Sequence, residues 1–217
     1  MRPVLVFSRT TGYRHESIPA GVAALAELGR LGGFPVESTE DAAAFTVAGL
    51  RRYGVVVFLN TSGDVLDDAQ RSAFEGYVRG GGGFVGVHCA AATEPGWPFY
   101  RWLVGAAFVD HPDVQPATVR VADPSHPATT DLPAVWPRVD EWYNFDAVPR
   151  AGPRVLLRVD ESSYDGGAMG PDHPVAWCHD EAGGRALYTA LGHTVEAYAE
   201  PALRAHLAGA LAWAAGS

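Results

Sequence analysis

The stretch Gly83-Phe84-Val85-Gly86-Val87-His88-Cys89-Ala90 decides the fold of this chain. Its first five residues are an apolar run typical of a buried strand, and small residues stand two positions before and two positions after His88. A tight strand-to-helix elbow needs small residues at these positions because its backbone is crowded. Such an elbow lifts its central side chain above the carboxyl edge of an open α/β sheet, where ligands bind. The central residue here is a histidine, where a nucleophilic serine or cysteine is usual.

Strands and helices alternate on the N-terminal side of this elbow. Short apolar runs predict strands at residues 4–7, 34–39 and 55–59. Helical spacing of apolar residues predicts helices that begin after Ser17 and Asp67, and each of these two side chains is expected to cap its helix. Strand and helix in alternation, with short connections, indicate a parallel sheet with helices on both faces.

The pattern is less regular between residues 93 and 153, where prolines, tryptophans and histidines gather. We interpret this segment as an irregular insertion over the active edge of the sheet, with one strand at 118–121. Strands are predicted again at 154–159, 175–178 and 185–189, and a closing helix at 201–214. The chain is therefore predicted to be one α/β domain over residues 1–217, with a flavodoxin-like, doubly wound and mostly parallel sheet.

The composition excludes several classes of partner and chemistry. The net charge of −9 over 217 residues argues against a nucleic-acid partner, because phosphate binding needs a basic face. No apolar stretch approaches the about 18 residues of a membrane span, and two cysteines make no disulfide framework, so we expect a cytoplasmic protein with no membrane partner. All 16 basic residues are arginine, which excludes lysine Schiff-base chemistry and the P-loop lysine.

Polar residues follow several predicted strands and are expected to meet at one edge of the sheet. The candidates for substrate contact in the loops after the first and third strands are Thr10, Tyr13, His15, Asn60 and Thr61. His88 and His193 follow two other strands, so they are expected to face each other. Two imidazoles in one crevice serve as acid and base near neutral pH, or as two ligands of a metal, and the sequence leaves both alternatives open.

A second group of candidates lies in the irregular segment. The run Asp140-Glu141-Trp142-Tyr143-Asn144 brings acid, aromatic and amide groups together. Within it, Glu141 is a candidate catalytic residue and Tyr143 a candidate for substrate binding. His111 is a further substrate-binding candidate, because it lies in the segment expected to cover the crevice. We interpret Cys89, one residue past the apex of the elbow, as a buried core thiol.

Three motifs together resemble the ThuA-like (trehalose-utilisation) family, and the likeness covers nearly the whole chain. They are the Gly-x-His-x-Ala elbow at 86–90, the run Asp140-Glu141-Trp142-Tyr143-Asn144-Phe145, and Ala190-Leu191-Gly192-His193-Thr194. The resemblance implies the class I glutamine amidotransferase-like fold, in which an elbow cysteine pairs with a histidine on a late strand. It puts His88 at the position of that cysteine, His193 near the partner histidine and Glu196 near the acid of the triad. Without a thiol at the apex, glutamine hydrolysis through a thioester has no nucleophile.

The resemblance also implies a role in sugar catabolism, on trehalose and related disaccharides through 3-keto intermediates. We expect a hydrolase, lyase or isomerase in which His88 and His193 supply base and acid. No cofactor is established by the sequence, but a divalent metal (zinc, manganese or iron), with His88 and His193 as candidate ligands, or the Arg14 region would supply the electrophile. The alternative is a non-catalytic sugar-binding or regulatory module that has lost the nucleophile.

The expected partner is a small sugar, and a homodimer is left open. The last predicted helix carries an apolar stripe of Leu203, Leu207 and Leu211. Such a stripe would serve either the core of the chain or a dimer contact.

Overall fold

A nine-stranded sheet forms the centre of the computed structural model, which describes residues 1–147 and 153–216. Its strand order is β2-β1-β3-β4-β11-β10-β9-β6-β7. In that order, the strands are Val36–Thr39, Val4–Phe7, Val55–Leu59, Gly83–Val87, Ala186–Thr189, Pro174–His179, Arg154–Asp160, Gln115–Val121 and Val135–Asp140. Two further strands, β5 (Phe108–Asp110) and β8 (Asn144–Phe145), form a separate antiparallel pair.

The half of the sheet from β2 to β11 is parallel, and the half from β10 to β7 continues it with antiparallel pairs. β1, β3, β4 and β11 are buried along their whole length. Layers on both faces of a parallel sheet demand continuous apolar runs of this kind. The predicted α/β class is confirmed, and the elbow after β4 lies in the parallel half, where its strands share one carboxyl edge.

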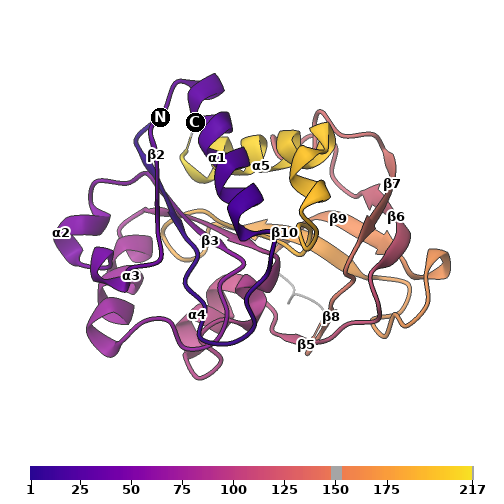
Figure 1. Cartoon of the computed structure of the whole chain (residues 1–217), viewed down its shortest axis with the longest axis horizontal. Helices are drawn as coiled ribbons and strands as arrows, with labels where there is room; N and C mark the ends of the chain where they lie inside the picture. The colour runs from indigo at the N-terminus through magenta and orange to yellow at the C-terminus, as the bar shows by residue number, and fades with distance from the viewer. Residues whose placement is uncertain (148–152, 217) are drawn as a thin grey trace.

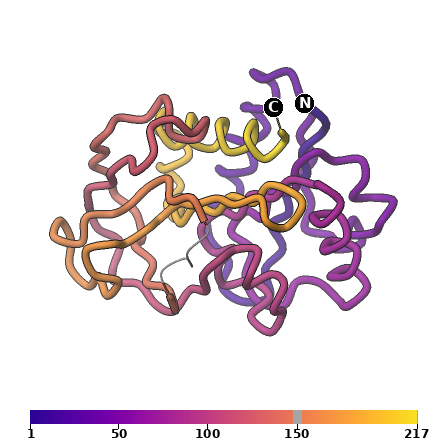
Figure 2. The backbone as a smooth tube through the Cα atoms, turned by 180° about the vertical axis from the view of Figure 1, so that it is seen from behind, coloured from indigo at the N-terminus to yellow at the C-terminus, as the bar shows by residue number. Residues whose placement is uncertain are grey.

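Helices cover both faces of the sheet (Figures 1 and 2). One face carries α1 (Ile18–Gly32) and α5 (Pro201–Ala214), and the other carries α3 (Asp68–Arg79) and α4 (Pro98–Val104), with α2 (Val47–Leu50) packed against α3. Within the described residues there are also four short 3-10 helices: η1 (Ala42–Ala44), η2 (His88–Ala92), η3 (Glu161–Ser163) and η4 (Glu196–Ala199). The leucine stripe of α5 is buried within the chain, so it serves the core.

The two predicted helix caps differ in outcome. The Asp67 side chain accepts a hydrogen bond from the Gln70 amide (2.8 Å), and the Gln70 side chain accepts one from the Asp67 amide (2.9 Å), so this cap is confirmed. Ser17 precedes α1 as expected, but its side chain makes no capping hydrogen bond, so that prediction was wrong. Its hydroxyl instead accepts from the Asn60 amide group (3.0 Å) and lies 3.4 Å from the Gly192 carbonyl.

Part of the segment between residues 93 and 153 extends the sheet. β6 pairs with β9 and β7 pairs with β6, so the segment adds two strands at the sheet edge where one, at 118–121, was predicted. β7 escapes prediction because its alternation is reversed: Trp136, Arg138 and Asp140 face inward, while Val135 and Val139 face solvent. Residues 148–152, which belong to the same predicted insertion, lie outside the described residues. Within the described part of the chain, no helix has the length and apolar character needed to cross a membrane.

A buried carboxylate at the end of β7 ties the two halves of the sheet together. The Asp140 side chain accepts hydrogen bonds from the Gly192 amide (2.9 Å) and the His193 amide (3.0 Å) in the loop after β11. It also accepts from the Arg138 guanidinium (2.8 Å) and from the Glu141 amide (3.0 Å). Asp140 is fully buried, so these donors replace all of its water. The carboxylate therefore fixes where the His193 loop lies relative to Glu141.

We expect Asp140→Asn to lower the free energy of unfolding by about 3 kcal/mol. The substitution leaves the buried Arg138 guanidinium without its carboxylate, and the new NH₂ group faces N–H donors, with which it cannot form hydrogen bonds. Glu200→Gln is the matched control. Glu200 is the second, half-exposed partner of Arg138 at 3.6 Å, and its loss should change the free energy by less than about 1 kcal/mol. Denaturant unfolding measures both. Equal effects of the two substitutions would contradict the proposed importance of Asp140.

His206 on α5 gives the fold a pH dependence. Burial lowers its pKa to about 4, although its Nδ1 lies 2.8 Å from the Ala128 carbonyl. The unfolded chain takes up this proton near pH 6.5, so the stabilising effect is complete above that pH and is lost as the pH falls toward 4. We expect His206→Gln to reduce the slope of unfolding free energy against pH by up to about 1.4 kcal/mol per pH unit in this window. Urea unfolding at a series of pH values tests this, and an unchanged slope would contradict it.

Candidate active site

The predicted elbow is present at the end of β4. His88, its apex, has a φ of +50°, in the left-handed region that non-glycine residues seldom adopt. A Cβ on Gly86 would lie 3.2 Å from the rings of Phe84 and Tyr188 and 3.4 Å from the Ala90 Cβ. The elbow therefore needs small residues on both sides of the apex, as its sequence indicates. The His88 carbonyl is held by the Tyr188 hydroxyl at 2.8 Å.

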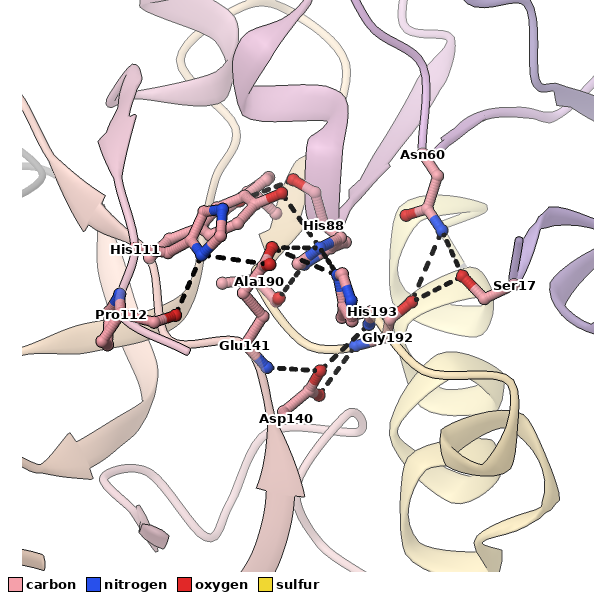
Figure 3. A network of polar contacts seen from close by, with 12 residues as sticks. Ser17, Asn60, His88, His111, Pro112, Asp140, Glu141, Ala190, Gly192 and His193 are labelled. Atoms are coloured by element: carbon pink, nitrogen blue, oxygen red, sulfur yellow. Dashed lines mark hydrogen bonds and ion pairs between the residues drawn. The ribbon is translucent and has the colours of Figure 1, made fainter. Parts of the chain in front are cut away.

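The His88 imidazole is fully buried and has a fixed orientation (Figure 3). Its Nδ1 lies 2.6 Å from the Ala190 carbonyl. Because a carbonyl only accepts, Nδ1 carries a proton. Nε2 then points toward three groups: the Tyr143 hydroxyl at 2.9 Å, the His193 Nδ1 at 3.2 Å and the Glu141 Oε2 at 3.3 Å. The Tyr143 ring stacks on the imidazole with 4.3 Å between centroids.

Glu141 is the carboxylate that joins the histidines. Its Oε2 lies 3.2 Å from the His193 Nδ1, and its Oε1 lies 3.1 Å from the His111 Nδ1. Burial opposes the charged form of Glu141, but hydrogen bonds from His193 and His88 outweigh it and hold the pKa of the carboxyl well below its usual range. Burial likewise opposes the charged form of His193, yet the hydrogen bond to Glu141 and its charge raise the pKa of His193.

His15 closes the cluster from the loop between β1 and α1. Its ring stands edge-on to those of His88 and His193, with 4.8 and 5.0 Å between centroids. Burial, followed by the proximity of His88 and His193, lowers the pKa of His15 to about 3, so it is neutral. One donor atom from each of His15, His88, Glu141 and His193 lies within 4.8 Å of the other three. We call these four residues the His3Glu cluster.

His111 and Tyr143 border the His3Glu cluster. The His111 side chain is 40% exposed, more than any histidine of the His3Glu cluster. Its Nδ1 also lies 2.9 Å from the Pro112 carbonyl. Burial raises the pKa of Tyr143 well above its usual value, so the hydroxyl stays protonated. His173 holds the backbone of Tyr143 through its Nε2, 2.9 Å from the Tyr143 carbonyl.

Other residues predicted to bind substrate lie at varying distances from this cluster. Asn60 and Thr61 are fully buried; the Asn60 amide group donates to Ser17, and the Thr61 hydroxyl pairs with that of Thr93 at 2.7 Å. These contacts give both residues a positioning role. Tyr13 is two-thirds exposed and packs edge-on against His15. Thr10 forms a β-bridge with Ser62 and makes none of the described contacts with the cluster.

Three further expectations concern reactive groups. Arg14 is half-exposed and pairs with Glu40 at 2.7 Å, and it makes none of the described contacts with the His3Glu cluster. Glu196, which the resemblance put near the acid of a triad, is exposed on η4, and the acid beside His193 is Glu141. Burial raises the pKa of the Cys89 thiol to about 11, in agreement with a core thiol.

Sequence reasoning missed the residues that position the site, above all Asp140. A usable signal exists: in the strand pattern of 135–140, the inward positions carry Arg138 and Asp140, and an opposite charge pair on a buried strand face marks a structural network. Ser17 gave no such signal, because serine before a helix is ordinarily a cap.

One cavity of the described structure lies away from the His3Glu cluster. It has a volume of about 590 Å³, and its lining includes Arg101, Trp102, Asp146 and His179. None of its lining residues belongs to the cluster. We locate the candidate site by its convergent side chains, because chemistry needs placed groups more than volume.

Comparison with known proteins agrees with the observed fold. The model of the ThuA family, described as trehalose utilisation, matches residues 3–214. No curated protein is significantly similar in sequence. A solved ThuA-like protein from Bacteroides uniformis is 27% identical with a TM-score of 0.84, over 98% of this chain and 91% of that chain. Another from Parabacteroides merdae is 19% identical with a TM-score of 0.81, over 99% and 90%.

The same fold occurs within larger proteins. A β-galactosidase from Rahnella sp. R3 is 15% identical with a TM-score of 0.60, over 96% of this chain and 30% of that enzyme, and this likeness concerns the fold alone. The family match over nearly the whole chain supports a role in sugar metabolism. The chain belongs to the ThuA, or trehalose-utilisation, family.

Proposed function

We propose that this protein is an enzyme of sugar catabolism that acts on 3-keto derivatives of disaccharides or glycosides such as trehalose, as a hydrolase, lyase or isomerase. Membership of the trehalose-utilisation family supports the substrate class. The observation that carries the enzymatic reading is the convergence of His15, His88, Glu141 and His193 at the carboxyl edge of the parallel strands.

The chemistry of a 3-keto sugar needs what this cluster offers. A ketone at C3 acidifies the C2–H bond, so a base removes that proton and leaves an enolate with its charge on the C3 oxygen. The C3 carbonyl then re-forms, a double bond forms between C1 and C2, and the bond from C1 to the glycosidic oxygen breaks. The departing oxygen takes up a proton. This elimination is a lyase reaction, and addition of water across the new double bond turns it into net hydrolysis. The step needs groups that move a proton and a group that stabilises the enolate oxygen.

The open side of the cluster is where proton transfer belongs. His193 and His111 are partly exposed, and both are held by Glu141, one on each carboxylate oxygen. His88 is fully buried, so we assign it to the floor of the site. The exposed ring of Tyr13 suits the apolar C–H surface of a sugar.

A binding module without catalysis is the alternative, and it predicts a different site. A sugar binder needs mainly aromatic and amide groups, whereas here five titratable side chains (His15, His88, His111, Glu141 and His193) lie together. This density favours the enzyme. A glutaminase is disfavoured because the only thiol near the elbow in the described structure, Cys89, is buried and protonated.

We expect His193→Ala and Glu141→Gln each to lower kcat/KM for 3-keto-trehalose at least about 100-fold, the usual effect of losing a general acid or base. Cys89→Ala is the matched control and should keep its activity, because the thiol is buried beside the elbow and takes no part. Product analysis by chromatography and mass spectrometry measures the rates.

Two results would contradict the proposal. Binding of 3-keto-trehalose in calorimetry without any turnover would make the protein a binding module. Release of ammonia from glutamine, abolished in Cys89→Ala, would revive the amidotransferase reaction.

A further inference from the structure

Three donor atoms of the His3Glu cluster form a nearly equilateral triangle. The separations are 3.2 Å between His88 Nε2 and His193 Nδ1, 3.3 Å between His88 Nε2 and Glu141 Oε2, and 3.2 Å between His193 Nδ1 and Glu141 Oε2. Ligand bonds of about 2.0–2.1 Å to a tetrahedral metal place neighbouring donors about 3.3–3.4 Å apart. The triangle therefore has the size of one face of a tetrahedral metal site.

The Ala190 contact of His88 turns its Nε2 into this triangle. The Ala190 carbonyl accepts the Nδ1 proton, so Nε2 is the ring nitrogen whose lone pair would bind a metal beside the Glu141 carboxylate. A cation placed between Nε2 and the carboxylate would be bound by both. A backbone carbonyl on the far ring nitrogen is also the common support of a metal-bound histidine. In the metal-free protein, the Tyr143 hydroxyl at 2.9 Å is the competitor for the same lone pair.

His15 supplies a fourth donor. Only 4% of the His15 surface is exposed, and its Nδ1 has no hydrogen-bond partner within the described structure. Its donor atom lies within 4.8 Å of the other three. All four donors of a tetrahedral metal lie about 3.3–3.4 Å apart at such bond lengths, so a four-coordinate site requires the His15 donor to move inward by up to about 1.4 Å.

The charges around Glu141 leave room for a cation. Its described ion-pair contacts are all with histidines: His88, His111 and His193. The nearest arginine in sequence, Arg138, is paired with Asp140 and Glu200. A divalent ion would neutralise the buried carboxylate without requiring any of the imidazoles to be charged.

We propose that His15, His88, Glu141 and His193 bind one divalent transition-metal ion. Three imidazoles and one carboxylate suit zinc or iron(II) better than magnesium or calcium, which prefer oxygen ligands. The proposal stands on the donor geometry and does not depend on the sugar substrate. If the proposed reaction also holds, the ion would supply the electrophile for the enolate oxygen. His193 would then be a ligand, and His111, which is not among the proposed ligands, would take over the role of proton transfer.

The test is metal binding by the whole chain, purified with a histidine-free affinity tag. Elemental analysis should find about one equivalent of transition metal per chain. After chelation, the protein should bind added Zn²⁺ in calorimetry, gain thermal stability and give the strong visible absorption of four-coordinate Co²⁺. Chelated protein that shows none of these responses to Zn²⁺ or Co²⁺ would overturn the proposal.

Variants identify the ligands. His15→Ala and Glu141→Gln should each weaken Zn²⁺ binding at least about 100-fold, since even the outer partners of metal ligands contribute 10–100-fold. His15→Ala removes an unbonded ring nitrogen, and Glu141→Gln keeps the volume, so both variants should fold by circular dichroism. Tyr143→Phe is the matched control and should keep the metal. Undiminished binding in His15→Ala and Glu141→Gln, or equal loss in Tyr143→Phe, would overturn the assignment.

The metal and the proposed function can fail separately. Bound metal lost in the ligand variants, with no turnover of keto-sugars, would support the site and contradict the reaction. Turnover by chelated protein that binds neither Zn²⁺ nor Co²⁺ would support the reaction and overturn the metal site.

Discussion

The candidate site depends on one buried carboxylate, that of Asp140. It stands at the end of the edge strand β7, yet it accepts the amides of Gly192 and His193, which follow β11 near the middle of the sheet. The end of β7 therefore lies against the loop that follows β11. Burying such a group is unfavourable unless every lone pair has a donor, so the end of β7, the Arg138 partner and the His193 loop form one structural unit.

Glu141 follows that carboxylate in the chain and has the opposite character. Asp140 is surrounded by N–H donors and a guanidinium, so its charge is fully used in holding the backbone. Glu141 faces imidazoles whose protonation or metal binding can change. Two adjacent acids thus have separate tasks, one fixing the geometry and the other taking part in the chemistry that we propose.

The parallel half of the fold could be predicted because its strands are continuous apolar runs, and the elbow could be predicted because crowding demands small residues around His88. The same logic brought His88 and His193 to one edge, and they do meet there. It failed for β7, where the inward face is charged, and for Ser17, whose hydroxyl serves Asn60 and Gly192. It gave no means of separating His15, inside the cluster, from Asn60, behind it, because a loop sequence does not reveal which side chain turns inward.

The His3Glu cluster draws its members from positions 15, 88, 141 and 193, that is, from almost the whole length of the chain. On the ribosome, the first three emerge well before His193, whose loop is fixed only when β11 has paired beside β4. No N-terminal fragment released early can hold a complete set of donors. A translation product interrupted before His193 would therefore lack the complete His3Glu cluster.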